Sequence, residues 1–518
     1  MKAPYKVVDL FAGPGGLAEG FSSVTADGKR LFEVALSVEM EPAAHKTLTL
    51  RSFTRQFPYR ILPDEYYSFV SGELALEGLQ DAYPQEWLAA AKEALRLELG
   101  TKEAAKKILP RVDEVRSQSN GRTILIGGPP CQAYSLVGRA RNAGNEAYVA
   151  EDDGRHFLYR EYIRILDRLR PAAFVMENVK GILSSSVAGG YIFERILDDL
   201  ENVGADNGGY RLVALTSPMA LSGRSPNVSS ASDFIVRAEA HGVPQARHRV
   251  FVVGLRADVA EASTFSSAQC LLPENDRVSV RTVIGNLPRL RSGLSRKDDE
   301  QDWRETVLGS TDELIELASR SEPPTALMGM KRKLKSVRSS LSRRNAPMER
   351  IADEYDPRGY SDGLPIELAS FLVDPRLPQL AHHESRGHMS RDLARYLFCA
   401  AYAEKKGRCA KASEFPDELA PNHQSWKSGK FADRFRVQTW ETPSTTITSH
   451  ISKDGHYYIH PDPAQCRSLT VREAARLQTF PDNYVFLGNR TQQYVQVGNA
   501  VPPYLAKQIA EALAKLLD

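Results

Sequence analysis

The sequence is poor in cysteine, has no long apolar run and carries almost no excess charge. Its five cysteines are an odd number without a C-x-x-C pair, so a disulfide framework is not expected and a reducing cytoplasm is the natural setting. The longest apolar runs, around Ile124 and Val250, span only a few residues, whereas a membrane-spanning helix needs about 18. A strand-like segment begins by Lys6, so no signal peptide is expected.

Charge and size narrow the classes of protein further. Lys plus Arg number 67 against 65 for Asp plus Glu, a net charge of +2, so a strongly basic nucleic-acid binder is excluded unless the basic patch is local. Hydrophobic residues at 42% and charged residues at 25% exclude a wholly disordered or fibrous chain. At about 150 residues per domain, the 518 residues correspond to roughly three domains, and two larger lobes fit equally well.

Strand-like and helix-like segments alternate over the first half of the chain. Apolar runs predict buried strands at 5–11, 31–39, 123–128, 172–177 and 248–255. Spacing and composition predict helices from Pro42, over 86–109 with an interruption at Gly100, and over 158–169, 192–200 and 505–516. The alternation predicts an α/β, doubly wound fold in which a mostly parallel sheet is covered on both faces. After about Ala257 the rhythm is lost, and 258–468 are predicted to form a second domain or a long insertion with irregular elements.

A glycine-rich turn, D-L-F-A-G-P-G-G (9–16), follows the first predicted strand. Gly13, Gly15 and Ala18 satisfy the pattern G-x-G-x-x-A, which lets a ligand approach the backbone closely, although a plain tight turn uses the same residues. Glu39 ends the second strand about 20 residues later, where an acid can accept from both ribose hydroxyls. A nucleoside cofactor is therefore expected, and at this point NAD and S-adenosylmethionine both remain open.

Cys131 lies in G-G-P-P-C-Q-A-Y-S (127–135), at the carboxyl end of the third predicted strand. A lone cysteine is usually a small buried hydrophobe. Here two prolines hold it on a loop where α/β enzymes place their ligands, which favours a nucleophile. A free thiol is only a few per cent thiolate at about pH 7, and a neighbouring arginine would raise that fraction.

Polar residues also follow the next two strands. Glu177 of M-E-N-V (176–179) ends a buried strand on the same rim and suits donating a proton or hydrogen bond; alternatively, Asn178 caps the following segment. In Q-A-R-H-R-V-F-V-V-G (245–254), Arg247 and Arg249 alternate with other residues of a predicted strand, so they are expected to share one face. They would form a surface ion-pair stripe or, opposite Cys131, donate to an anion or a base edge.

Taken together, F-A-G-P-G-G, G-P-P-C-Q-x-x-S, E-N-V, Q-x-R-x-R and V-G-N-A-V-P-P (497–503) occur in one order. This set strongly resembles the cytosine-5 DNA methyltransferase family, of bacterial or phage type, over about 5–47, 123–255 and 468–518. L-T-V-R-E-A-A-R-L-Q-T-F-P (469–481) is similar to the family's ninth motif, which organises the recognition domain. The resemblance implies a Rossmann-like methyltransferase sheet with a second, smaller, irregular target-recognition domain. The expected boundaries are 1–268 with an insertion at about 52–120, then 269–487, and 488–518 returning to the catalytic domain.

The resemblance also implies residue roles. S-adenosylmethionine would be held by Phe11, Ala12, Gly13, Gly15 and Gly16, with Glu39 on its ribose, Met40 against adenine, and Pro130 and Asn499 on its methionine side. Cys131 would attack carbon 6 of a cytosine flipped out of double-stranded DNA, and Glu177 would protonate or hydrogen-bond ring nitrogen 3. Arg249 would hold the carbonyl oxygen of the base, with Arg247 nearby. DNA contacts are expected from Gln132, Ser135, Arg139, Lys331, Arg332, Lys333 and Lys335.

Two regions depart from the family's pattern or extend it. The short acidic third motif, which contacts the adenine amine, has no clean match between Thr47 and Thr123; Asp113 is a weak candidate.

Residues 327–350 hold eight Lys or Arg against one acid, a local net of +7, which favours phosphate contact over a merely solvated face. P-S-T-T-I-T-S-H (443–450) is expected to re-enter the sheet edge of the recognition domain, with hydroxyls near phosphates. No metal is predicted, because the spacing of His382, His383, His388, Cys399 and Cys409 fits no standard zinc pattern.

Other functions explain fewer residues. The family's tRNA-methylating branch has a short recognition region, whereas this one is long and basic. Amino methyltransferases need an acid or Asn before Pro-Pro-aromatic, whereas this loop reads Gly-Pro-Pro-Cys. An NAD oxidoreductase gives no account of Cys131, Glu177 and Asn499. The intact Cys131, Glu177 and Arg249 argue against an inactive DNA-binding relative. The chain is expected to act as a monomer in the cytoplasm, at the nucleoid, with restriction or defence proteins as candidate partners and no membrane association. The DNA target, the role of the insertion and the identity of any partner nuclease do not follow from the sequence.

Overall fold

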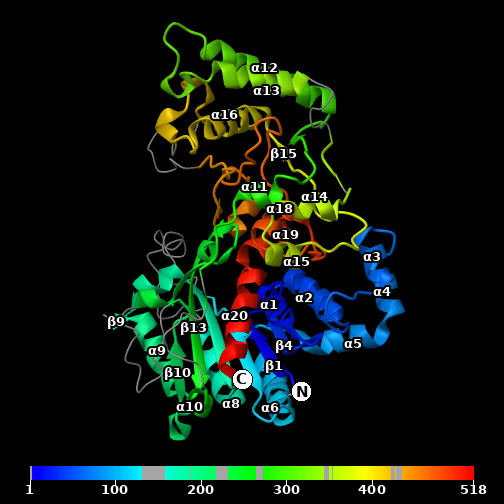
Figure 1. Cartoon of the computed structure of the whole chain (residues 1–518), viewed down its shortest axis with the longest axis vertical. Coiled ribbons are helices and arrows are strands. Elements are labelled where there is room, and N and C mark those ends of the chain that lie inside the picture. The colour runs from blue at the N-terminus through cyan, green and yellow to red at the C-terminus, as the bar shows by residue number, and fades with distance from the viewer. Residues whose placement is uncertain are drawn as a thin grey trace.

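The structure, a computed structural model, describes residues 3–130, 158–187, 190–216, 231–263, 272, 274–342, 349–352, 354–421, 426 and 434–517. Two lobes are stacked along the long axis, with the sheet in the lower lobe and a group of helices in the upper one (Figure 1). None of the helices in the described part of the chain is long and apolar enough to cross a bilayer.

An eight-stranded sheet forms the centre of the lower lobe, among the described residues. Seven strands follow the order β10 (Tyr210–Val213), β13 (His248–Arg256), β7 (Ala173–Val179), β6 (Thr123–Gly127), β1 (Tyr5–Leu10), β4 (Phe32–Glu39) and β5 (Ala94–Arg96). The strands from β7 to β5 are parallel, whereas β13 is antiparallel to β7 and pairs on its other side with β10 and β11 (Ile235–Arg237). The prediction of a mostly parallel, doubly wound sheet is confirmed.

Helices cover both faces of this sheet because successive strand residues point to opposite sides. In β1, Val7 packs in one buried cluster with Phe21 and Leu513, from α1 (Gly16–Ser22) and α20 (Pro503–Leu517). The next residue, Val8, packs in the other cluster, which contains α6 (Lys102–Gln118), α8 (Leu158–Leu169) and α9 (Ile192–Asn202). The last helix of the chain thus completes the core that the first strand begins.

The segment 86–109, predicted as helical with an interruption at Gly100, contains a strand between its two helical parts. It contains the end of α5 (Pro84–Glu93), then β5, and then the first half of α6. Ala94 and Leu95 favour helices locally, but they pair with Ser37 and Val38 of β4, so tertiary pairing overrides propensity. Gly100, with φ of 91°, separates β5 from α6. β5 and α6 thus belong to the sheet and its cover, and the bounds of the insertion at about 52–120 stay a prediction.

The predicted insertion contains α3 (Asp64–Val70), α4 (Leu76–Ala82) and α5, which pack on α2 (Pro42–Arg55) through a small aromatic core. It also reaches the segment that leads away from the upper lobe: Arg376 donates to Leu62 O at 2.9 Å, and Tyr67 Oη donates to Asp374 at 3.1 Å. The insertion therefore braces the connection between the lobes.

The upper lobe contains more regular structure than the sequence predicts. Its core is formed by α12 (Glu300–Leu317), α13 (Lys331–Ser342) and α16 (Ser390–Lys406), which bury Trp303, Leu334 and Leu397 against one another. Shorter elements connect it to the sheet: α11 (Val280–Ile284), α14 (Pro357–Ser361), α15 (Ile366–Leu372), α18 (Val471–Leu477) and α19 (Arg490–Asn499). Several of these share the hydrophobic core of the lower lobe, and the boundaries at 269 and 487 stay predictions.

The segment 443–450 also differs from its prediction. Its strand, β16 (Ser444–Thr445), does not join a recognition-domain sheet but pairs in parallel with β12 (Gln245–Ala246), just ahead of β13. Its hydroxyls bond to protein: Thr446 Oγ1 donates to Ala246 O at 2.6 Å, and Thr445 Oγ1 donates to Gln438 at 3.0 Å. The expected phosphate contacts of these threonines are therefore replaced by contacts that hold the segment in place.

Candidate active site

The glycine-rich turn forms a tight bend between β1 and α1. Phe11 has φ of 57° and Gly13 has φ of 57°, and a Cβ added to Gly13 would meet nothing within 4 Å. At Gly16 the opposite holds, because a Cβ there would lie 2.3 Å from Val501 O. The turn is thus open on one side, where a ligand fits, and closely packed on the other against the residues that follow Asn499.

Glu39 joins this turn to the end of β4. Its Oε2 accepts from the N–H of Gly13 at 2.8 Å and its Oε1 accepts from the N–H of Glu41 at 2.7 Å. Burial raises the pKa of Glu39, while these backbone donors act in the opposite direction. The next side chain, Met40, is 56% exposed. An anchored acid, an exposed thioether and open space at Gly13 together fit the ribose and base of a nucleoside.

The loop that follows β6 carries the predicted nucleophile. Gly128, Pro129 and Pro130 are described, with Pro130 partly buried. Cys131 and the predicted DNA contacts Gln132, Ser135 and Arg139 lie outside the described residues. Their roles stay predictions.

Glu177 and Arg249 form an ion pair at the carboxyl end of β7. Arg249 Nε lies 3.1 Å from Glu177 Oε1, and both side chains are mostly buried, at 15% and 14% exposure. The pair results from the antiparallel register, in which Arg249 lies opposite Val179 and Phe251 opposite Glu177. A Cβ on Gly128 would lie 2.9 Å from Glu177 Oε2, so the carboxylate packs directly against the loop that leads to Cys131.

Asn178 also contacts the loop that leads to Cys131. Its Nδ2 donates to Pro129 O at 3.1 Å, and its Oδ1 accepts from the N–H of Val179 at 2.8 Å. The following 3-10 segment (Lys180–Ser184) has no side-chain cap, so the alternative role of Asn178 as a cap is wrong. The sequence offers no signal for this contact except its place in E-N-V.

Arg247 lies just before the strand that carries Arg249. β13 begins at His248, and Arg247 precedes it with only 2% of its surface exposed. Its Nη1 donates to Ile447 O at 2.8 Å and to Gly498 O at 3.3 Å. Burial lowers the pKa of the Arg247 guanidinium, and the neighbouring positive charge of Arg249 lowers it further. Carbonyls from two remote segments take up the Arg247 donors, whereas Arg249 pairs with Glu177, so the two guanidiniums have different partners. That both arginines share one strand face stays a prediction.

Asn499 lies exposed at the end of α19. The residue after it, Ala500, accepts from Gln478 Nε2, and a Cβ on Gly16 would touch Ala500 Cβ at 3.4 Å. Asn499 therefore emerges next to the start of α1, beside the glycine-rich turn.

Other predicted residues lie elsewhere. Asp113 is exposed on α6, paired with Arg168 at 2.5 Å, which gives it no place beside Glu39. On α13, Lys333 pairs with Glu404 at 2.5 Å, whereas the remaining predicted DNA contacts of this helix are exposed: Lys331, Arg332 and Lys335.

The histidines and cysteines of the rejected zinc pattern have protein partners or lie apart. His382 accepts from the N–H of Phe486 at 3.0 Å, and His383 lies 2.8 Å from Pro288 O. Within the described ranges, no three His, Cys, Asp or Glu side chains are grouped as a metal site.

The sheet has parallel strands bordered by the antiparallel β13, a glycine-rich turn after β1 and an acid, Glu39, at the end of β4. This arrangement defines the class of protein, an α/β methyltransferase. The sequence model of the C-5 cytosine-specific DNA methylases matches residues 86–515. The Type II methyltransferase M.Bpa9945I of Bacillus paralicheniformis is 32% identical over 99% of both chains. The DNA (cytosine-5-)-methyltransferase M.ApeKI of Aeropyrum pernix is 28% identical, over 76% of this chain and 81% of its own.

A solved structure agrees on the fold. A prophage-encoded DNA modification methyltransferase of E. coli aligns over 99% of both chains with a TM-score of 0.50 and 19% identity. The chain belongs to the C-5 cytosine-specific DNA methylase family and is a DNA (cytosine-5-)-methyltransferase.

Proposed function

We propose that the chain methylates carbon 5 of a flipped-out cytosine through covalent attack by Cys131, with Glu177 and Arg249 holding the base. The observation that carries this proposal is the Glu177–Arg249 pair, packed against Gly128 of the loop that leads to Cys131. Cytosine is not a carbon nucleophile until a nucleophile adds to carbon 6, so the reaction needs a covalent residue on this loop.

The residues divide the reaction between them. The Cys131 thiolate forms a bond to carbon 6, and the electron pair of the 5,6 double bond moves toward carbon 5. Glu177 donates a proton or hydrogen bond to ring nitrogen 3, so that negative charge does not build on the ring, an effect typically worth about 10²–10⁴ in rate. After carbon 5 has accepted the methyl group it loses its proton, and the Cys131–carbon 6 bond breaks. Taking the base out of the stack costs a few kcal/mol.

S-adenosylmethionine, which the family implies, supplies the methyl group as an electrophile. The proposed contacts are Phe11, Ala12, Gly13, Gly15, Gly16, Glu39, Met40, Pro130 and Asn499. The open side of the turn at Gly13 and the anchored carboxylate of Glu39 support this placement. The residues after β5 border the same edge, since Leu97 N donates to Glu39 O at 3.2 Å. We assign the missing adenine contact to this segment, 97–99.

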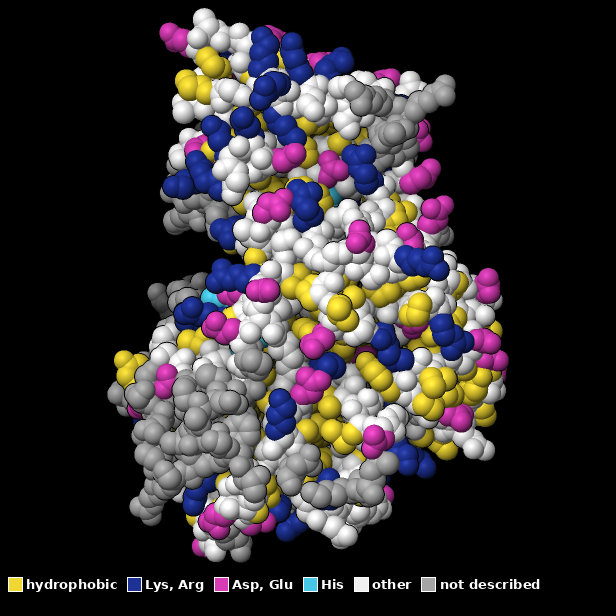
Figure 2. All heavy atoms as spheres, viewed as in Figure 1, with side chains coloured by type: hydrophobic (Ala, Val, Ile, Leu, Met, Phe, Trp, Pro, Cys, Tyr) yellow, Lys and Arg dark blue, Asp and Glu magenta, His cyan; other side chains and the backbone are white. Residues whose placement is uncertain are grey.

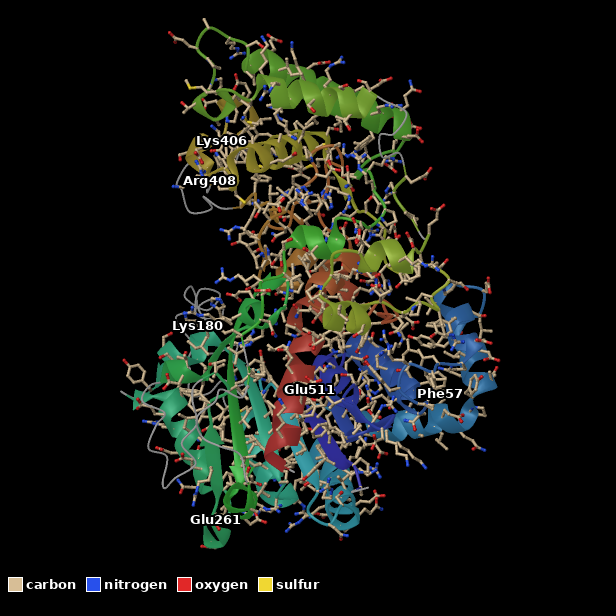
Figure 3. The ribbon with its side chains drawn as sticks, viewed as in Figure 1. Phe57, Lys180, Glu261, Lys406, Arg408 and Glu511 are labelled. Carbon is tan, nitrogen blue, oxygen red and sulfur yellow. The ribbon has the colours of Figure 1, made fainter. Side chains whose placement is uncertain are left out.

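Double-stranded DNA is proposed to lie between the lobes. The space-filling view is hollowed at the junction of the lobes, on the left of the molecule (Figure 2). Lys180, directly after the E-N-V motif, lies on the lower side of this junction, and Lys406 and Arg408 lie on the same side of the view in the upper lobe (Figure 3). Cations on both sides suit a phosphate backbone. α13 lies farther out, beyond α16 (Figure 1), so its exposed cations would add contacts at the outer end of a bound duplex.

The relatives named as Type II methyltransferases support a role in protecting host DNA from a partner nuclease. Bisulfite sequencing of DNA from cells that express the chain tests the activity and identifies the target. We expect converted reads to retain cytosine at one short motif, and Cys131→Ser to abolish this retention. Retention in cellular RNA with none in DNA would instead favour the tRNA-methylating branch, and retention at wild-type level in Cys131→Ser would place the nucleophile elsewhere.

A further inference from the structure

One guanidinium joins two chain segments that are far apart in the sequence. Arg247 Nη1 donates to Ile447 O at 2.8 Å, and Nη1 and Nη2 both reach Gly498 O, at 3.3 and 3.4 Å. Its acceptors among the described residues are main-chain carbonyls, and Nε has no hydrogen-bond partner there. A buried cation without a paired carboxylate is expensive, so the role of Arg247 must depend on what it holds together.

The two segments also touch directly. A Cβ on Gly498 would lie 2.2 Å from the carbonyl carbon of Thr448 and 2.3 Å from the nitrogen of Ser449. Two backbones this close cannot shift independently. Gln245 adds to the junction, since its Oε1 accepts from the N–H of Ile447 at 2.8 Å.

The segment 446–449 continues into the upper lobe. Tyr458 Oη accepts from the N–H of Thr448 at 3.1 Å and donates to Thr446 O at 3.2 Å. Two residues earlier, His456 Nδ1 lies 2.7 Å from the hydroxyl of Tyr396, which is buried in α16. A displacement of the helices in the upper lobe is therefore transmitted to 446–449.

The segment that contains Gly498 leads in the other direction, toward the glycine-rich turn (9–16). Asn499 is the next residue, and Val501 O packs against Gly16. Arg247 thus bridges two carbonyls from different parts of the molecule. Ile447 O belongs to a segment connected with the upper lobe, and Gly498 O belongs to a segment that borders the glycine-rich turn.

We propose that Arg247 is a positioning residue that couples cofactor binding to DNA binding, by fixing the segment 446–449 and the Gly498–Asn499 bend as one unit. This rests on the proposed function, in which Asn499 contacts the cofactor and the lobes enclose DNA. When DNA sets the position of the upper lobe, the bend takes its cofactor-binding geometry, and each ligand tightens the other by the same factor. Both Nη atoms of Arg247 reach Gly498 O from one rigid plane while Nη1 also reaches Ile447 O, and the single ammonium of lysine cannot reproduce this forked contact.

Calorimetric titration of S-adenosylhomocysteine, with and without a duplex carrying the methylated motif, measures this coupling. For the wild type we expect the duplex to tighten binding by about fivefold or more. In Arg247→Lys the ratio of the two dissociation constants falls toward one. Thr446→Val, which removes only the bond to Ala246 O, lowers the ratio less and guards against an Arg247 variant that does not fold.

Arg30→Lys is the matched control. Its guanidinium is also largely buried and bound to carbonyls, those of Ser22, Arg55 and Phe57, and burial lowers its pKa as well. Both lysine variants lose thermal stability, but the Arg30 variant keeps the wild-type ratio. A wild-type ratio in Arg247→Lys, or a ratio of one in a wild type that binds both ligands, overturns the coupling. A wild type that binds neither ligand contradicts the proposed function instead.

Discussion

Replacing Asn178 by Asp isolates the contact that holds the loop leading to Cys131. The side chain is 5% exposed, and its amide donates to Pro129 O at 3.1 Å while its other atom accepts from the N–H of Val179. The isosteric carboxylate keeps the acceptor but places an oxygen against the Pro129 carbonyl. Leaving a buried acceptor unpaired costs about 1–3 kcal/mol, which corresponds to a loss of about 5- to 150-fold in the population of the native loop.

The loss depends on pH with a definite sign. Burial without a cationic partner raises the pKa of the introduced carboxyl group, and its protonated form can again donate to Pro129 O. The defect is therefore largest at high pH and shrinks as the pH falls through that raised pKa, whereas the amide of the wild type does not titrate. Methyl incorporation into DNA, measured as the ratio of variant to wild type from about pH 8 to about pH 5, follows this change.

Asn286→Asp provides the control, because Asn286 also donates its amide to a carbonyl, Gly359 O at 2.9 Å, but at an exposed site. Its activity should stay close to that of the wild type at every pH. An Asn178→Asp enzyme with undiminished activity, or with a loss that is the same at all pH values, would refute the role of this contact.

Three further predictions concern the cofactor, the outer helix and the nucleophile. Glu39→Ala should weaken S-adenosylmethionine binding by about 1–3 kcal/mol through a lost charged hydrogen bond; calorimetry that shows tight NAD binding instead would contradict the cofactor. Replacing Lys331, Arg332 and Lys335 by Gln should reduce the slope of log affinity against log salt by about 0.9 for each lost phosphate contact, and an unchanged slope would show a merely solvated face. DNA with 5-fluorocytosine at the target should trap a covalent adduct in denaturing gels, since fluorine cannot leave as a cation, and Cys131→Ser should form none while still binding the cofactor, because a hydroxyl is a far poorer nucleophile.

Most of the sheet could be predicted because its central strands are continuous apolar runs, as buried parallel strands are. β5 could not be predicted, because Ala94–Arg96 is short and consists of residues that favour helices. Only its pairing with β4 makes it a strand. The helices of the upper lobe left a signal, because Trp303, Val307, Leu314 and Leu317 follow helical spacing and are buried. The Pro- and Ser-rich composition of the surrounding residues favours irregular structure and masks this helical signal.

In the site, the residues at strand ends were predictable and the contacts between distant segments were not. Glu39 is the last residue of its strand and Glu177 lies two residues before the end of its strand, so local pattern suffices to place them near the sheet edge. Arg247 is 200 residues from Ile447 and 251 from Gly498, and nothing in Q-A-R-H-R indicates which carbonyls its guanidinium meets. Its neighbour Arg249 has the same residue type and two-residue spacing, yet a partner on the adjacent strand gives it a different role.

The packing of α20 against α1 has a consequence for the order in which the chain becomes active during synthesis. α1 buries its face on α20, with Gly20 so close to Ala506 that an added Cβ would lie 2.4 Å away. The glycine-rich turn thus lacks its support until α20 has left the ribosome, and at about 5–20 residues per second the stretch from 257 to 502 takes about 12–50 s to make. During that time the upper lobe can fold around its own core, whereas one face of the sheet in the lower lobe remains uncovered until α20 is made. A chain truncated before α20 is therefore expected not to methylate DNA.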